Sequence, residues 1–220
     1  MSQLVPPRFL FRWSFPVRRL ERRSSSSGRL LDLPEHFRIP LLGELDAAPS
    51  FADVRLAWSP EGIGLSAAVT GRTRQPTCDS ELPTNSDGMH IWVDTRNTQS
   101  VHRGTKFCQQ FSLLPMGGGA NKSDPFACAV PLARSREEVS LPDAALIELQ
   151  AGISSDGYWL EAWLPKEVLF GYEPALHQSL GFHFVVRDSQ FGEQSLAVNH
   201  DFPYATDPSL WQTLELVSEQ

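Results

Sequence analysis

Apolar and polar residues alternate between positions 156 and 190 in a pattern that predicts two β-strands, each with two different faces. The first strand, YWLEAWL (158–164), has an apolar face made of Tyr158, Leu160, Ala162 and Leu164. Its other face carries Trp159, Glu161 and Trp163. The second strand, FHFVVRD (182–188), repeats this arrangement, with His183 and Arg187 opposite its apolar face. A solvated face is normally rich in small polar residues, so these second faces are expected to be covered or to contact a ligand.

The same alternation predicts strands along most of the chain. Residues 51–71 predict a hairpin with Ser-Pro-Glu-Gly as its turn. Further strands are expected at residues 89–94, 107–114, 126–130, 145–153 and 211–217. Helical patterns are confined to the short stretches 165–172 and 135–139. Many short strands separated by turns rich in proline and glycine predict an all-β fold, an antiparallel β-sandwich with one or two short helices.

Charge divides the chain into two parts. Residues 1–30 hold seven arginines and one acidic residue, a local charge of +6, which leaves −13 for the rest of the total charge of −7. We therefore expect a basic, aromatic N-terminal arm at 1–30, with an added strand and a serine-rich loop, and one sandwich domain at 31–220. The acidic domain repels polyanions, so no nucleic-acid partner is expected.

The chain has no apolar run near the roughly 20 residues needed to span a bilayer, and its first residues lack the order of a signal peptide. A cytoplasmic location without a membrane partner is therefore expected. Cys78, Cys108 and Cys128 are odd in number and lack C-x-x-C spacing. Free buried thiols are expected rather than disulfides or a zinc site.

Four stretches, in this order, resemble the family 9 carbohydrate-binding modules (CBM9) and the wider DOMON-like group: residues 51–71, 86–97, 156–169 and the final pair 180–190 with 207–216. The resemblance implies a β-sandwich. It also implies binding of a glycan without chemistry, by stacking a sugar ring on aromatic side chains and hydrogen-bonding its hydroxyls. Fold carries over more safely than function, because binding sites are built onto shared folds.

If the strands with large outer residues are neighbours, they create one aromatic ligand-binding face, formed by His90, Trp92, Arg103, Trp159, Glu161, Trp163, His183 and Arg187. Lys106 and Gln109 are expected at its rim. In the alternative interpretation the N-terminal arm packs across this face and makes a second core. The arm would supply Phe9, Phe11, Trp13 and Phe15, with Arg12 as a partner for Glu161.

No catalytic motif is present, so a non-catalytic domain is predicted. No cofactor is expected to be required. Three metal or cofactor sites are less favoured alternatives. The first two, which relatives suggest, are calcium on Asp87, Asp94 and Asp188 and haem held by Met89 and a histidine. The third is a transition metal on His90, His102 and His183. The leading hypothesis is glycan binding by the sandwich. An intracellular protein-interaction module that binds its partner through the basic arm is the alternative from another class.

Overall fold

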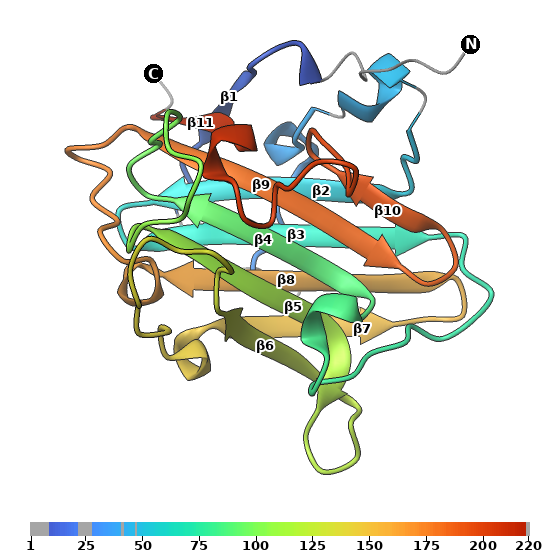
Figure 1. Cartoon of the computed structure of the whole chain (residues 1–220). Helices are drawn as coiled ribbons and strands as arrows, with labels where there is room; N and C mark the ends of the chain where they lie inside the picture. Colours follow the sequence, from blue (N-terminus) through green and yellow to red (C-terminus); the bar gives the residue numbers. More distant parts are fainter. Residues whose placement is uncertain (1–8, 22–27, 41, 47, 219–220) are drawn as a thin grey trace.

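The computed structural model describes residues 9–21, 28–40, 42–46 and 48–218, and shows two β-sheets packed face to face (Figure 1). The described residues form a seven-stranded sheet, in the order β1-β11-β9-β4-β5-β6 with β10 also on β9, and a four-stranded sheet, in the order β2-β3-β8-β7. The strands are β1 (Ser14–Arg18), β2 (Ala52–Ser59), β3 (Gly62–Thr70), β4 (Gly88–Asp94), β5 (Cys108–Gly118), β6 (Asp124–Val130), β7 (Glu148–Ile153), β8 (Gly157–Pro165), β9 (Ser179–Asp188), β10 (Gly192–Ser195) and β11 (Gln212–Val217). The predicted antiparallel β-sandwich is therefore confirmed.

The main core lies between the two sheets, and the residues that fill it follow the period of two seen in the sequence. The four-stranded sheet contributes the predicted apolar faces of β2, β3 and β8, including Leu56, Leu65 and Leu160. The seven-stranded sheet contributes Ile91 and Phe184, which are fully buried. Burial of each such side chain contributes about 1.5–3 kcal/mol, so the stretches of strictest alternation supply much of the stability.

The predicted short helices differ from the observed structure. Helical turns are all 3-10 in the described residues: η2 (Glu35–Phe37), η3 (Leu42–Asp46), η4 (Pro83–Asn85), η5 (Ala144–Leu146), η6 (Lys166–Val168) and η7 (Pro208–Leu210). The stretch 165–172 therefore contains one short turn, and Gly171, at φ 77°, redirects the chain soon after it. The prediction of a helix at 135–139 is wrong. There Ser135 Oγ donates to the carbonyl of Leu132, and the N–H of Arg136 donates to the carbonyl of Gly104, so the segment is a loop held by non-helical hydrogen bonds.

The N-terminal arm contributes a strand to the edge of the seven-stranded sheet. β1 pairs in parallel with β11, with Ser14 opposite Thr213. Its two inward side chains, Phe15 and Val17, join the main core. The serine-rich loop expected after it falls largely on residues 22–27, outside the described residues. Ser14–Arg18 is therefore part of the sandwich rather than a free basic tail.

A buried ionic cluster connects the two sheets at one end of the sandwich. Arg72, 3% exposed, follows β3 of one sheet, whereas Asp87 and Asp188 lie at the ends of β4 and β9 in the other. The Arg72 guanidinium donates to Asp188 and lies 3.2 Å from Asp87 Oδ2. It also donates to the carbonyls of Arg74 and Gln75. Further backbone N–H groups satisfy the two carboxylates, so no charge in this cluster is left without a partner.

We expect Arg72→Ala to lower the free energy of unfolding by about 3–5 kcal/mol, because it leaves two buried carboxylates without their cation. Urea denaturation should show a lower midpoint at an unchanged slope. Arg74→Ala removes an exposed cation two positions away and is the matched control, with an expected change within about 0.5 kcal/mol. Equal effects of the two substitutions would show that the cluster does not hold the sheets together.

Candidate functional site

The eight residues predicted to form one ligand-binding face do not share a surface. Trp159, Glu161 and Trp163 lie on β8, which pairs with β3 and β7 in the four-stranded sheet. His90, Trp92, His183 and Arg187 lie on β4 and β9 of the other sheet. Both groups point away from the main core, so they face opposite sides of the sandwich. The prediction of a single aromatic face is therefore wrong, because the strands that carry these residues belong to different sheets.

The outer face of the four-stranded sheet is covered by residues 28–33. Glu161 is 1% exposed and accepts hydrogen bonds from Arg29 Nη2 at 2.9 Å and from the N–H groups of Leu31 and Asp32 at 2.9 and 3.1 Å. The Arg29 guanidinium also lies 3.4 Å from the ring centroid of Trp159. This geometry combines a buried ion pair with a cation–π contact. The carboxylate of Glu161 thus fixes residues 28–33 across the sheet as a strap.

Trp163 is buried below the same strap and packs with Leu31 and Leu33. The alternative interpretation was therefore right that the chain covers this face, but wrong about the segment. Trp13 instead lies beside β11, where its backbone N–H donates to Gln212 Oε1. Arg29, rather than Arg12, pairs with Glu161.

The outer face of the seven-stranded sheet is covered by the loop between β10 and β11. Tyr204 in that loop lies over Trp92 and His183, with ring centroids 5.1 and 4.6 Å away. Trp211 fixes the loop by donating its indole N–H to the carbonyl of Tyr204 at 2.8 Å. A second, smaller core results, which includes Val185 and Val198. Trp92 is consequently a packing residue in this arrangement.

His90 and Arg187 are held by neighbouring polar groups. His90 Nε2 lies 3.0 Å from the carbonyl of Ser86, so this nitrogen carries the proton, and Nδ1 accepts from Ser112 Oγ at 2.9 Å. Burial lowers the pKa of His90 to about 4, so its ring is neutral at pH 7. Arg187 donates to Glu193 at 2.7 Å at the sheet edge.

The arrangement of the metal and haem candidates does not favour those sites. Met89 points into the main core, whereas His183 lies on the opposite face of the same sheet, so the two cannot hold one haem. Asp94 lies at the far end of β4 from Asp87, which separates the expected calcium ligands. Within residues 9–21, 28–40, 42–46 and 48–218 there is no group of three or more His, Cys, Asp or Glu side chains arranged to hold a metal.

His102, Asp207 and Ser209 form a hydrogen-bonded group that contains the residue types of a catalytic triad. Asp207 Oδ2 and Ser209 Oγ both lie 3.1 Å from the same nitrogen, His102 Nδ1. Ser209 Oγ also donates directly to Asp207 Oδ1 at 2.6 Å. A triad requires the acid and the nucleophile on different ring nitrogens. The group therefore caps the loop before β11 instead of activating a serine.

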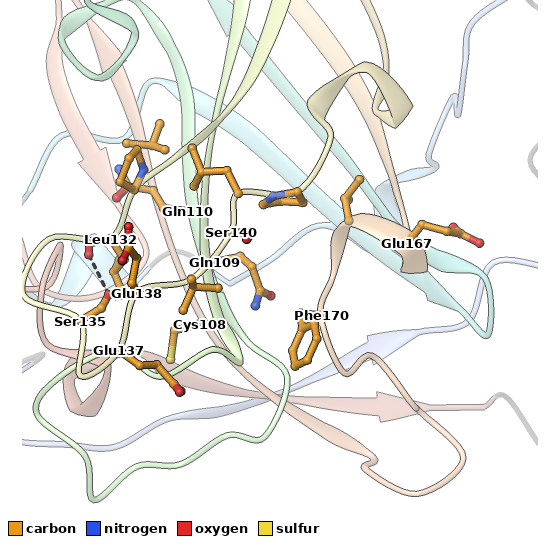
Figure 2. Close-up of a pocket in the computed structure, with 16 residues that line it drawn as sticks. Cys108, Gln109, Gln110, Leu132, Ser135, Glu137, Glu138, Ser140, Glu167 and Phe170 are labelled. Atoms are coloured by element: carbon orange, nitrogen blue, oxygen red, sulfur yellow. Dashed lines mark hydrogen bonds between the residues drawn. The ribbon is translucent and has the colours of Figure 1, made fainter.

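A cavity of about 440 Å³ opens at the edge of the seven-stranded sheet, and we call it the edge pocket (Figure 2). β6 ends opposite Gln110, so Cys108 and Gln109 at the start of β5 have no strand beside them on that side. The chain leaves the sheet here as the loop 131–142, which forms one wall. The segment after β8 forms another wall through Val168 and Phe170.

The loop wall is held by hydrogen bonds from the residues before β5. Arg103 donates to the carbonyls of Arg134 and Ser135 at 2.9 and 3.1 Å. The N–H of Lys106 donates to Glu137 Oε1 at 3.1 Å. Arg103, a predicted site residue, therefore shapes the wall through the backbone of the loop.

The polar lining of the edge pocket suits hydrogen bonding to a ligand. Its polar members are Gln109, Gln110, Ser135, Ser140, Glu137, Glu138 and Glu167. Gln109 is 6% exposed and donates through Nε2 to the carbonyl of Lys106 at 2.8 Å. Its Oε1 accepts no hydrogen bond from any described residue. An amide oxygen in this state is stabilised when a ligand or a water molecule donates to it.

The aromatic wall is Phe170, which is 52% exposed. Neither Phe170 nor the glutamates were predicted from the sequence, because both fall in stretches read as short helices. Cys108 offers no nucleophile in the pocket, since burial raises the pKa of its thiol to about 11. The site is thus equipped for binding through apolar contact and hydrogen bonds.

Two solved structures of a CBM9 module from Caldicellulosiruptor kristjanssonii have the same fold as this chain. The one in complex with cellotriose has a TM-score of 0.63 and 14% sequence identity, over 94% of this chain and 95% of that one. The one in complex with glucose has a TM-score of 0.62 and 15% identity, over 94% and 97%. The sequence matches no protein-family model and no curated protein. The fold is therefore CBM9-like, whereas the likeness to DOMON-like domains stays a prediction.

Among the described residues, no helix has the length and apolar character required to cross a membrane. The expected cytoplasmic location stays a prediction.

We expect His90→Gln to change how stability depends on pH. Because the folded-state pKa of His90 is lowered from 6.5 to about 4, its contribution is complete above about pH 6.5 and is lost as the pH falls towards 4. Over that window the wild-type protein should lose on the order of 3 kcal/mol more than the variant. Urea denaturation at a series of pH values measures this difference. Parallel curves would contradict a buried, neutral His90.

Proposed function

We propose that this chain is a non-catalytic carbohydrate-binding domain that holds a sugar in the edge pocket. The observation that carries the proposal is the half-exposed ring of Phe170 in the same cavity as two glutamine amides, two serine hydroxyls and the glutamates. The CBM9 modules of the same fold, one with cellotriose and one with glucose, support the ligand class by analogy.

The chemistry of the pocket matches the two kinds of surface on a sugar. A pyranose ring presents an apolar C–H face, which stacks on an aromatic side chain such as Phe170. Its hydroxyl groups both donate and accept, and they suit the Gln109 and Gln110 amides and the carboxylates of Glu137 and Glu138. One stacked ring and a few hydrogen bonds, offset by desolvation, correspond to a Kd on the order of 10 μM to 1 mM.

Binding without catalysis agrees with the groups present. The Cys108 thiol stays protonated at neutral pH, and the group around His102 lacks the geometry of a triad. No histidine lines the described part of the edge pocket, and we assign its three glutamates to binding.

A second groove, of about 400 Å³, runs between residues 9–12 and the loop before β11. It is lined by Phe9 and Phe11, which are both exposed, and by Arg12 and His102. Its aromatic rings suit contact with a protein partner of the N-terminal arm. Such a partner stays a prediction. It also provides an internal comparison for the edge pocket, because both grooves expose a phenylalanine.

We expect Phe170→Ala to weaken binding of cellotriose about ten-fold or more, equivalent to about 1.4 kcal/mol, through loss of the stacking surface. Isothermal titration calorimetry on the full chain measures the effect, and thermal unfolding checks that the variant stays folded.

Phe11→Ala is the matched control, since Phe11 is 56% exposed and lies in the other groove. Its affinity for cellotriose should equal that of the wild type. Loss of binding in Phe11→Ala alone would move the sugar site to the second groove. Absence of binding to any oligosaccharide tested would overturn the proposed function.

A further inference from the structure

The charged side chains that line the described part of the edge pocket are all acidic: Glu137, Glu138 and Glu167. From this and the geometry below we propose that the pocket selects sugars with a free amino group, such as glucosamine units. The selection rests on the proposed function, because it assumes that a sugar enters this pocket.

The carboxylates of Glu137 and Glu138 are placed to recognise one substituent of a sugar ring that stacks on Phe170. In Figure 2, Glu137 and Glu138 lie on one side of Gln109 and Phe170 lies on the other. Glu167 extends away from this group. A ring stacked on Phe170 therefore shares the cavity with the Gln109 amide and the glutamate pair, which are polar groups that its substituents can reach.

Both carboxylates of the pair keep free acceptor capacity. Among the described residues, Glu137 accepts the N–H of Lys106 at 3.1 Å, which occupies one lone pair, and Glu138 has no hydrogen bond or ion pair. Neither Lys106 nor Arg103 forms an ion pair with the two glutamates among the described residues. Lys106 Nζ lies 5.3 Å from the ring centroid of Phe107 and 5.6 Å from that of Phe170, and Arg103 donates to loop carbonyls. Arg136 is exposed on the loop.

The buried amide of Gln109 independently indicates a donor-rich ligand. Its Oε1 has no donor among the described residues although the side chain is 6% exposed. Gln109, Glu137 and Glu138 all line the edge pocket, so acceptor oxygens outnumber donors among these three side chains. An ammonium group has three N–H donors and no acceptor, whereas a hydroxyl has one donor. An acetamido group brings a carbonyl oxygen against the carboxylates, and an acidic sugar brings a like charge, so both are disfavoured.

Three β-1,4-linked trisaccharides that differ at C2 test this selection: cellotriose with a hydroxyl, the glucosamine trimer with an amine, and its N-acetylated form. Calorimetry on the full chain at about pH 6 and 0.15 M salt should show the glucosamine trimer binding roughly ten-fold tighter than cellotriose, and the N-acetylated trimer no tighter than cellotriose. At about pH 9, where an amine with a pKa near 8 is mostly neutral, the preference should shrink.

The double variant Glu137→Gln with Glu138→Gln should reduce the ratio of the two affinities to about one, because neutral amides lack the charge that attracts the amine. Its side chain at 137 still accepts from Lys106, which preserves the loop. Glu81→Gln removes one exposed charge near the opposite end of β4 and should keep the wild-type ratio.

The outcomes separate this inference from the proposed function. Equal affinities for the three trisaccharides, all weakened by Phe170→Ala, would overturn the amine selection and leave sugar binding intact. The preference for the glucosamine trimer could also survive in the double variant, or fall equally in Glu81→Gln. Either result would assign the preference to the overall acidity of the chain instead of to Glu137 and Glu138. Absence of binding to all three would overturn both.

Discussion

The buried guanidinium of Arg72 sets the geometry on which the rest of the sandwich depends. It is the cation between Asp87 and Asp188, so it ties the loop after β3 to the start of β4 and the end of β9. β4 pairs with β9 on one side and with β5 on the other, and the start of β5 lies opposite Asp94, at the other end of β4 from the cluster. The edge pocket lies there because β6 stops short. The charge cluster and the cavity therefore lie at opposite ends of β4.

Both outer faces of the sandwich carry large side chains, and the chain itself covers them. The strap at 28–33 closes over Trp159 and Trp163, and the loop before β11 closes over Trp92. Glu161 shows the physical reason for the strap, because a buried carboxylate must be matched by donors, and the strap supplies a guanidinium and two backbone N–H groups. With both faces closed, recognition is left to the edges and loops, where apolar and polar groups remain accessible together.

The alternation of residues was enough to predict the fold class and the inward faces, because burial on a strand has a period of two. It could not assign strands to sheets, since pairing partners such as Gly64 and Trp163 are far apart in sequence and obey no local rule. For the same reason the partner of Glu161 was predicted as Arg12 instead of Arg29. Gln109 was expected near a binding rim and does line the pocket, whereas the loop with Glu137 has a helical pattern that contacts from distant residues override.

The parallel pairing of β1 with β11 makes the order of synthesis part of the folding problem. Trp13 and Gln212, which are hydrogen-bonded, lie 199 positions apart, so the first strand emerges from the ribosome long before its partner is made. At about 5–20 residues per second, that delay is roughly 10–40 s. Throughout it Phe15 and Val17 lack the core that buries them, and the alternating segment around them is open to pairing with another nascent chain. β11, made long after β1, is the strand that gives β1 its place in the sheet.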